Sequence, residues 1–350
     1  AKTDFVSPPV SASTGNGAFG EGASVFGDIF FSPRSVDIQG LPFENPATGG
    51  SIYYRQNNSI QHPLWTVANA SNEQLTNRFF GNASVQYDFS DNLNVVYRFG
   101  LDYYNERNTN SQNKGGVNSN NPTARVLQGI YDVWDNNNTI MDHNILLNGE
   151  YDLSDKVGMS FNLGATSRHE DFQQNGIQSA GQVVFGMLRH NNFTSYQDVQ
   201  FSRTRNILGV YGSTSFDYDN FIYATLSARN DWTSNFSEEN RSLFYPSASL
   251  SFIPTQAFDG LRSDGGLNYL KLRAGYGTSA GFSTGYPTFN GLNTDTNAYD
   301  ASFNGGGVLI TNSTSSLLAN PDIKPERVDE LEFGAEASFL KRRVNLDLSY

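Results

Sequence analysis

A serine motif near residue 280 has the spacing that nucleophilic catalysis could use. The stretch Gly277-Thr278-Ser279-Ala280-Gly281 matches G-x-S-x-G, in which the serine occupies a sharp turn between a strand and a helix. An aspartate and then a histidine must follow the serine in the chain. Here a segment rich in Gly, Asn and Thr follows, and no histidine occurs after His190. The pattern predicts a flexible strand exit, and we do not expect an enzyme.

Residues that could bind a metal ion are equally sparse. The four histidines, at positions 62, 143, 169 and 190, are far apart and form no H-E-x-x-H motif. Asn293, Asp295 and Asn297 have the spacing that opens a calcium loop, but Ala298 and Asn304 replace the glycine and glutamate that such a loop needs. The chain contains no cysteine, which excludes disulfides and thiolate ligands. We expect no metal and no cofactor, with calcium held by other loop ligands as an open alternative.

Regularly spaced carboxylates invite comparison with glycoside hydrolases, which act through a pair of acidic side chains. Glu330, Glu332 and Glu336 alternate with the apolar residues of segment 331–339. Alternate side chains of a strand point to opposite faces, so the glutamates share one face. We interpret them as part of a solvated wall rather than as a catalytic pair. Further charged residues are expected on the same wall: Arg98, Asp102, Glu150, Lys271 and Arg273.

Alternation of apolar and polar residues predicts the strands that must position this wall. It is clearest in 79–89, 93–103, 145–153, 157–165, 208–218, 222–228, 244–252, 270–276, 331–339 and 344–350. These segments give about ten strands in consecutive hairpins. Short links at 90–92, 154–156, 219–220, 253–267 and 340–343 alternate with long polar stretches at 104–142, 166–205, 230–242 and 278–326. We predict an all-β, antiparallel fold with long loops at one end only.

Strand length separates two β architectures. The alternating segments run to about 11 residues, or roughly 25 Å at 3.3 Å per residue and a 45° tilt, which is the height of the apolar band of an outer-membrane barrel. Strands in soluble domains average about 5–6 residues. Because an open edge would leave backbone groups unpaired in lipid, such strands must close into a ring. We therefore expect a transmembrane antiparallel β-barrel with a polar lumen, and a secreted β-sandwich adhesin fits less well.

Net charge and the sequences of the chain ends add information on partners and on the extent of the chain. The 350 residues carry a formal net charge of −12, which disfavours nucleic acid as a partner. The N-terminal residues have neither the basic nor the apolar segment of a secretion signal. Tyr350 lies inside an alternating stretch, where a strand has no reason to stop. We expect that both ends are cut from a longer chain and that the ring continues beyond them.

Aromatic residues fall into two groups. Tyr103 and Tyr276 lie at strand ends on the apolar face, where an aromatic girdle is expected. The rings of the second group could stack on sugar or peptide ligands, or pack between loops and against a lid. We take that group as candidate contacts with substrate or lid. It lies in or beside the long polar stretches: Trp65, Tyr131, Trp134 and Trp232.

Four segments resemble the SusC/RagA type of TonB-dependent outer-membrane transporter. They are HPLWTVANASNEQLTNRFFGNASVQYDF (62–89), ARNDWTSNFSEENRSLFYPSASLSFIPTQAF (228–258), LNYLKLRAGYGTSAG (267–281) and NPDIKPERVDELEFGAEASFL (320–340). They occur in the order that this family shows, and the resemblance covers 62–350 well and 1–61 loosely. It implies a barrel of about 22 strands filled by an N-terminal plug. It also implies a location in the outer membrane of a Gram-negative, Bacteroidota-type bacterium.

The resemblance further implies a function and partners. We expect TonB-dependent import of oligosaccharide or peptide nutrients, with a SusD-like surface lipoprotein as a lid and TonB reached through a part outside this chain. Residues 1–78 are expected to form an extracellular-loop region that leads into the barrel, and residues 79–350 the barrel strands and loops. The alternative is a barrel of the same family that acts as a structural or assembly scaffold in a larger outer-membrane complex.

Overall fold

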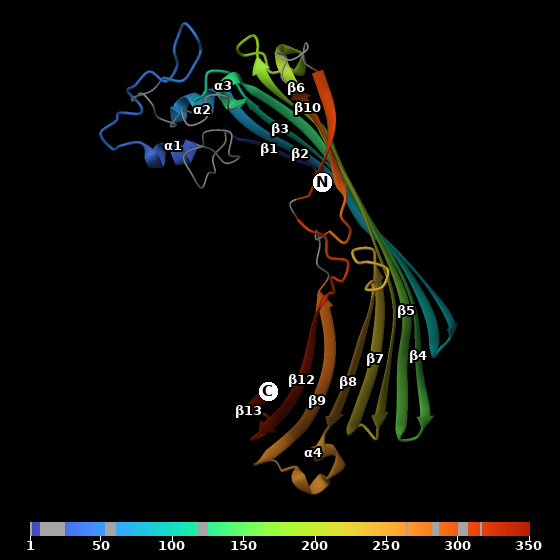
Figure 1. Cartoon of the computed structure of the whole chain (residues 1–350). Coiled ribbons are helices and arrows are strands. Elements are labelled where there is room, and N and C mark those ends of the chain that lie inside the picture. The colour runs from blue at the N-terminus through green and yellow to red at the C-terminus, as the bar shows by residue number, and fades with distance from the viewer. Residues whose placement is uncertain are drawn as a thin grey trace. The chain divides into compact units, whose positions relative to one another are not determined.

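Strands dominate the computed structural model, which describes residues 2–7, 25–52, 61–117, 125–263, 265–281, 287–299, 307–315 and 317–350. Eleven strands form one sheet in the order β1-β2-β3-β4-β5-β6-β7-β8-β9-β12-β13 (Figure 1). Every pairing with a defined register is antiparallel. A separate antiparallel pair is formed by β10 (Leu292–Tyr299) and β11 (Gly307–Thr314). The predicted all-β antiparallel fold is confirmed.

The strands of the large sheet differ greatly in length. The first five are β1 (Lys2–Ser7), β2 (Ala70–Ser90), β3 (Leu93–Gln112), β4 (Ile130–Ser154) and β5 (Val157–Gln182). The others are β6 (Phe193–Tyr218), β7 (Ile222–Thr233), β8 (Ser242–Phe252), β9 (Leu267–Gly281), β12 (Glu326–Phe339) and β13 (Val344–Ser349). Since β2 begins at Ala70, the domain boundary proposed at 78/79 falls inside a strand.

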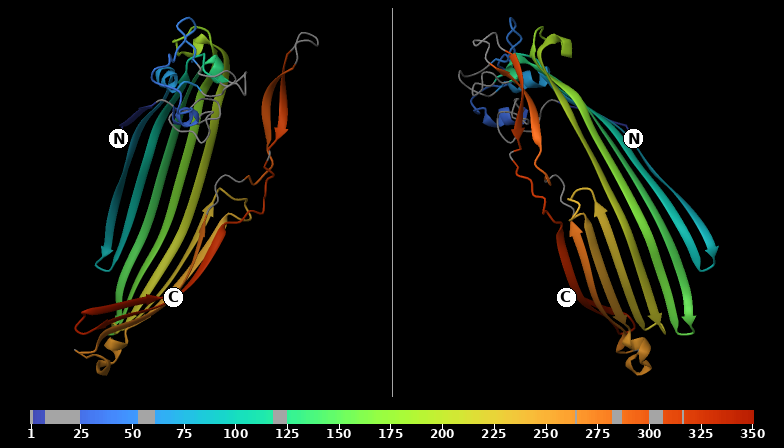
Figure 2. Two further views of the ribbon diagram at one scale, coloured as in Figure 1. Left: turned by 90° about the vertical axis from the view of Figure 1, so that its left-hand side faces the viewer. Right: turned by 45° about the vertical axis from the view of Figure 1, so that its right-hand side comes forward.

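Helical segments are short and lie between the strands. They are α1 (Val25–Phe31), α2 (Pro63–Asn69), α3 (Arg125–Gln128), α4 (Pro254–Ala257), η1 (His190–Asn192) and η2 (Asp259–Leu261). In the described ranges, no helix has the length and apolar character needed to cross a membrane. The helix α4 lies in the link from β8 to β9, at the end of these strands where the short turns are found (Figure 2).

The short turns predicted from sequence are present, and two of them have left-handed backbone conformations. Asp219 and Asn220 join β6 to β7 with φ of 50° and 58°, a left-handed conformation that Asp and Asn tolerate better than most residues. Leu340, Lys341 and Arg342 join β12 to β13 with φ of 53° to 61°. These side chains lack the local hydrogen bonding that favours Asp and Asn there, so the second turn is the more strained of the two.

The prediction of long loops at 104–142 and 166–205 is wrong, because most of both stretches is strand. The apolar alternation stops in these stretches, but polar side chains pair across neighbouring strands in its place. Asn105 donates to Asn137 at 2.8 Å, Gln174 donates to Asn136 at 2.8 Å, and Thr204 donates to Asp171 at 2.9 Å. Several polar side chains of these stretches are buried, among them Ser111, Asp132 and Ser179, so the hydrophobic pattern ends before the strand does.

The chain divides into two compact units. The first comprises Ala1–Gly81, Leu101–Ile140 and Glu170–Thr204, and the second comprises Asn82–Gly100, Met141–His169 and Arg205–Tyr350. The first unit has a polar interior: Asn113 donates to Asn69 at 3.0 Å and accepts from Gln182 at 2.9 Å, and all three side chains are buried. Hydrogen bonds of this kind offset the cost of burying polar side chains.

Asp28 on α1 is a buried carboxyl group of the first unit without such a partner. Its side chain is fully buried, and neither carboxylate oxygen makes a hydrogen bond. Burial raises the pKa of Asp28 to about 8, and the nearby backbone N–H of Gln61 only partly opposes this rise. The carboxyl group is therefore expected to hold its proton at neutral pH as long as α1 stays in place.

Candidate functional site: the charged face of β9, β12 and β13

In the second unit, strand register brings together some of the charged residues that the sequence assigns to one wall. Lys271 on β9 pairs with Glu336 on β12, and Glu336 pairs in turn with Asp347 on β13. Paired residues of neighbouring strands present their side chains on the same face, so a row of charges crosses three strands. The opposite face carries large apolar side chains that are about half exposed, among them Leu331, Phe333 and Leu348.

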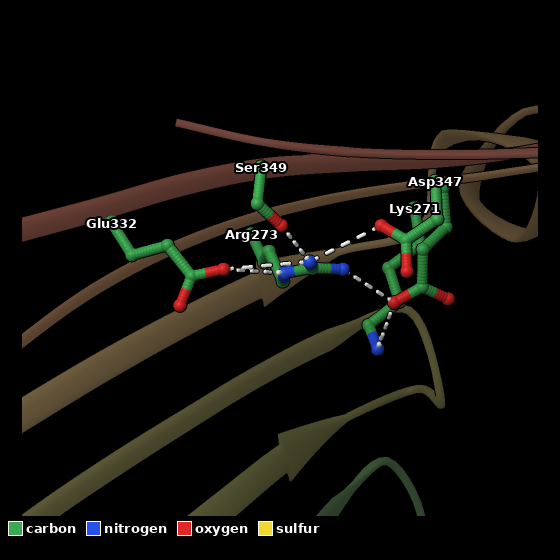
Figure 3. A network of polar contacts seen from close by, with 6 residues as sticks. Lys271, Arg273, Glu332, Asp347 and Ser349 are labelled. Carbon is green, nitrogen blue, oxygen red and sulfur yellow. Dashed lines mark hydrogen bonds and ion pairs between the residues drawn. The ribbon is translucent and has the colours of Figure 1, made fainter. Parts of the chain in front are cut away.

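Arg273 is the centre of this row and contacts a carboxylate on each side (Figure 3). Its Nη1 lies 2.8 Å from Oε1 of Glu336, and its Nη2 lies 3.2 Å from Oδ1 of Asp347 and 3.4 Å from Oε1 of Glu332. Nη2 also donates to the hydroxyl of Ser349. Glu336 accepts a second charged hydrogen bond, at 3.3 Å, from Nζ of Lys271. We call these six residues the Arg273 network.

A glycine makes the central position of Arg273 possible. Gly334 lies directly opposite Arg273 in the register, and the guanidinium crosses β12 over it. A Cβ at Gly334 would lie 2.6 Å from Cζ and 2.8 Å from Cγ of Arg273, well inside van der Waals contact. The glycine therefore supplies space for a neighbouring side chain, which is one of the established reasons for a glycine within a strand.

The wall is hollowed on the side of the network that faces β7 and β8. One hollow of about 510 Å³ is lined by Tyr223, Ser251, Tyr269 and Lys271 together with Arg273 and Glu332. A neighbouring hollow of about 270 Å³ is lined by Ser227, Ser247, Glu330 and Glu332. Both contain hydroxyl groups and fixed charges, and no nucleophile paired with a base. This surface can bind hydrated polar groups or the polar surface of another protein segment.

The structure distributes the other predicted charged residues elsewhere on the strands. Asp102 forms a two-pronged ion pair with Arg78 on β2, with Nε 2.8 Å from Oδ1. Glu150 is exposed, and its backbone pairs with Asn92 beside the turn between β2 and β3. Arg98, on β3, has no direct contact with the Arg273 network within the described ranges. Of the eight predicted residues, Lys271, Arg273, Glu332 and Glu336 belong to the Arg273 network, and Glu330 lines the adjoining hollow.

Sequence patterns did not identify three contributors to this site. Gly334 and Ser349 have no chemistry of their own, and only the register shows that they adjoin Arg273. The third, Tyr269, shares the parity of Lys271 on β9, so the same alternation could have placed it on the wall.

The aromatic candidates, expected in or beside the long polar stretches, lie in helices or strands. Trp65 belongs to α2, is fully buried, and donates from Nε1 to the carbonyl oxygen of Gly49 at 2.7 Å. It has no surface left for a ligand, so the prediction of a substrate contact is wrong for this residue. Tyr131 lies in β4, with its ring 4.8 Å from that of His190. Trp134 also lies in β4, and Trp232 lies near the end of β7. A ligand contact by Tyr131 or Trp134 stays a prediction, whereas Trp232 pairs with Leu208 and lies on the apolar face that carries Leu331, away from the charged wall.

The motifs considered for catalysis and metal binding do not form such sites in the described residues. Ser279 of the G-x-S-x-G motif lies within β9 and pairs with Val328 on β12, so it does not occupy a turn between a strand and a helix. No group of three or more His, Asp or Glu in the described part of the chain could hold a metal ion. The side chains of Asn293, Asp295 and Asn297 lie outside the described set.

Comparisons with known proteins agree with this architecture. The chain is 25% identical over 311 residues to the TonB-dependent receptor P26 of Formosa agariphila, covering 83% of this chain and 29% of the relative. It is 23% identical over 305 residues to the TonB-dependent receptor P3 of the same organism, covering 83% and 28%. The solved structure described as the RagAB peptide transporter superposes with a TM-score of 0.69 at 17% identity, over 85% of this chain and 32% of that one.

The chain thus spans less than a third of the length of each of these relatives. Residues 22–350 match the family described as TonB dependent receptor-like, beta-barrel. Since this match covers almost the whole chain, and the antiparallel sheet has the apolar and the charged face that a membrane barrel requires, the chain belongs to the TonB-dependent receptor β-barrel family.

Proposed function

We propose that this chain is part of a transporter in the outer membrane of a Bacteroidota-type bacterium, and that the whole protein imports peptide or oligosaccharide nutrients in a TonB-dependent manner. The observation that supports this most strongly is the contrast between the two faces of the strands. One face bears exposed apolar side chains such as Leu331 and Phe333, and the other bears the Arg273 network. A barrel with a wet, charged lumen suits the passage of polar solutes.

Peptides suit this lumen better than neutral sugars do. Arg273 and Lys271 stand next to Glu332, Glu336 and Asp347, so charges of both signs are fixed on one wall. A peptide offers ionised groups of both signs that can pair with them, whereas a neutral oligosaccharide offers only hydroxyls. The structural relative RagAB is named a peptide transporter, which agrees with this choice.

A SusD-like lipoprotein is the expected partner at the end opposite the short turns. No covalent chemistry is assigned to the chain, because its described polar clusters contain no activated nucleophile. The alternative function is a scaffold within a larger outer-membrane complex, which would need the same membrane face and no passage of cargo.

An uptake experiment separates import from scaffolding. The full-length gene would be deleted and then restored in its host, and accumulation of labelled peptide mixtures and of labelled oligosaccharides would be measured. The control is a full-length variant that cannot couple to TonB but keeps the barrel intact. Import predicts that peptide accumulation is lost on deletion and in the uncoupled variant. Equal accumulation in all strains, together with altered composition of the surface complex on deletion, would favour the scaffold.

A further inference from the structure

An apolar groove lies on the outward face of the second unit, away from the charged wall. Its volume is about 370 Å³, and its lining includes Ile145, Ala165, Leu208, Val210 and Trp232. Small residues of β5, Ala165 and Ser167, form its floor between bulkier side chains of the strands on either side. Tyr97 and His143 adjoin it, and the Tyr97 hydroxyl lies 2.7 Å from Nδ1 of His143.

Strand register shows that this groove faces away from the lumen. Starting from Leu331 on the apolar face of β12, successive pairs lead through Tyr276, Ala248 and Leu226 to Thr214 on β6. The side chains of Leu208 and Val210 have the same parity as Thr214, and Trp232 pairs with Leu208. These residues therefore lie on the face that carries Leu331.

Hydrogen bonds on the charged face show which side chains of β4 and β5 point outward. Thr166 on β5 accepts from Arg229, and Asn144 on β4 donates to the Tyr211 hydroxyl, and both contacts lie on the charged face. The neighbouring positions on each strand, including Ala165 and His143, must then face outward, because alternate side chains of a strand point to opposite faces.

The depth of the groove follows from its distance to the short turns. The groove lies about ten residues from the short turn before β5 and about ten residues from the short turn after β6. This separation is roughly 23 Å along the membrane normal at 3.3 Å per residue and a 45° tilt. Short turns face the periplasm in barrels of this class, so the groove lies at the outer edge of an apolar band of about 25 Å. Just beyond it the outward face becomes polar, where His169 contacts Asn206 at 2.7 Å and the backbone N–H of Asn206 donates to Ser234 at 2.9 Å.

We propose that this groove is a binding site for one acyl chain of an outer-leaflet lipid, with the headgroup of that lipid at the polar cluster His169–Asn206–Ser234. The groove is continuous with the membrane-facing surface, its lining is apolar, and the polar groups lie on the side toward the headgroups. Trp232 stands at this boundary, the depth at which tryptophan is enriched in membrane proteins. The proposal is independent of the transported solute and holds for an importer and a scaffold alike.

Lipid retention by the full-length receptor tests this site. The protein would be purified from outer membranes, exchanged exhaustively into fresh detergent, and analysed for bound lipid. Ala165→Leu fills the floor of the groove, and Ala228→Leu is the matched control, because Ala228 is exposed on the same face and lies outside the groove. We expect retained lipid with the unmodified receptor and with Ala228→Leu. Ala165→Leu should retain lipid roughly tenfold more weakly, the equivalent of about two buried methylene groups. Equal retention by both variants, or equal loss from both, would overturn the proposal.

A fluorescence measurement covers the case in which Ala165→Leu does not fold, which heat-modifiable migration on gels would show. The receptor is reconstituted with a phospholipid brominated on its acyl chains and then exchanged into detergent. The contribution of Trp232 is the difference between the unmodified receptor and Trp232→Phe. Quenching of this contribution that persists after exchange supports a retained acyl chain in the groove. Quenching that disappears together with the bulk lipid contradicts it.

Discussion

Replacing Gly334 with alanine tests the arrangement of the charged wall most sharply. A Cβ at this position would lie 2.6 Å from Cζ of Arg273, about 0.8 Å inside ordinary van der Waals contact of at least 3.4 Å. The guanidinium must move by roughly that distance. The ion pair with Glu336, now 2.8 Å long, would then lengthen to about 3.6 Å, beyond a hydrogen bond.

The matched control is Gly277→Ala on β9. Gly277 faces the same hollowed wall, and a Cβ there meets no atom within 4 Å. A glycine replaced by alanine without a clash stabilises a protein by about 0.4–1 kcal/mol, because the unfolded chain loses freedom. We expect this gain for Gly277→Ala and its complete loss for Gly334→Ala, measured as urea midpoints of the folded receptor in lipid vesicles.

Repeating both glycine substitutions in the Arg273→Ala variant shows whether Arg273 causes the difference in stability. In Arg273→Ala no side chain crosses β12, so Gly334→Ala and Gly277→Ala should have equal effects there. If Gly334→Ala is as stable as the control in the unmodified receptor, or if the difference persists without Arg273, the reasoning about this contact is wrong.

Three further substitutions probe other parts of the structure. Trp65→Phe removes the donor to the carbonyl of Gly49 from a fully buried site, and should destabilise the first unit by about 2 kcal/mol and speed its cleavage by proteases. The pKa of Asp28 is about 8 in the folded protein against an ordinary value of 3.8. Its protonation therefore contributes fully to the stability of the folded state below pH 4, and this contribution is lost as pH rises to 8. Cleavage at 25–31 should therefore be faster at pH 8.5 than at pH 5, after correction with an unstructured peptide, and Asp28→Asn should abolish this difference; an unchanged difference would contradict burial of the carboxyl. Phe333→Arg places a charge on the apolar face and should cost about 2–4 kcal/mol in folding into bilayers, whereas Glu330→Arg on the hollowed face should cost little. Equal folding yields for Phe333→Arg and Glu330→Arg would contradict the assignment of the apolar face to lipid and of the hollowed face to water.

The alternation of residues was sufficient to predict the two faces of the later strands. Between 331 and 348 the apolar residues face one environment and the charged residues face another. Because alternate side chains of a strand point to opposite faces, the sequence of such a strand must alternate with a period of two. The same reasoning placed Lys271, Arg273, Glu332 and Glu336 on one wall, and in the structure these four side chains form ion pairs with one another.

The contacts within that wall depend on register, which the alternation does not specify. Arg273 reaches three carboxylates because Gly334 is its direct neighbour, and a slip of two residues would preserve both faces and replace the partners. The long polar strands were missed because many of their buried side chains, such as Ser111, Asp132 and Ser179, are polar and leave no apolar period. The burial of Trp65 depends on Gly49, sixteen positions earlier, and on the packing of α2 that brings them together.

Cysteine scanning along β12 tests the central claim most directly. This chain contains no cysteine, and any cysteine in the rest of the full-length receptor would first be replaced by serine. Single cysteines at 330–333 and at 335–336 of the full-length receptor would be treated in intact outer membranes with a small water-soluble maleimide, and separately spin-labelled to measure contact with oxygen dissolved in lipid. We predict that positions 330, 332 and 336 react with the maleimide, and that 331, 333 and 335 react poorly and show high oxygen contact. Reaction without this alternation, or water access at 331 and 333, would contradict the assignment of one face to lipid and the other to an aqueous lumen.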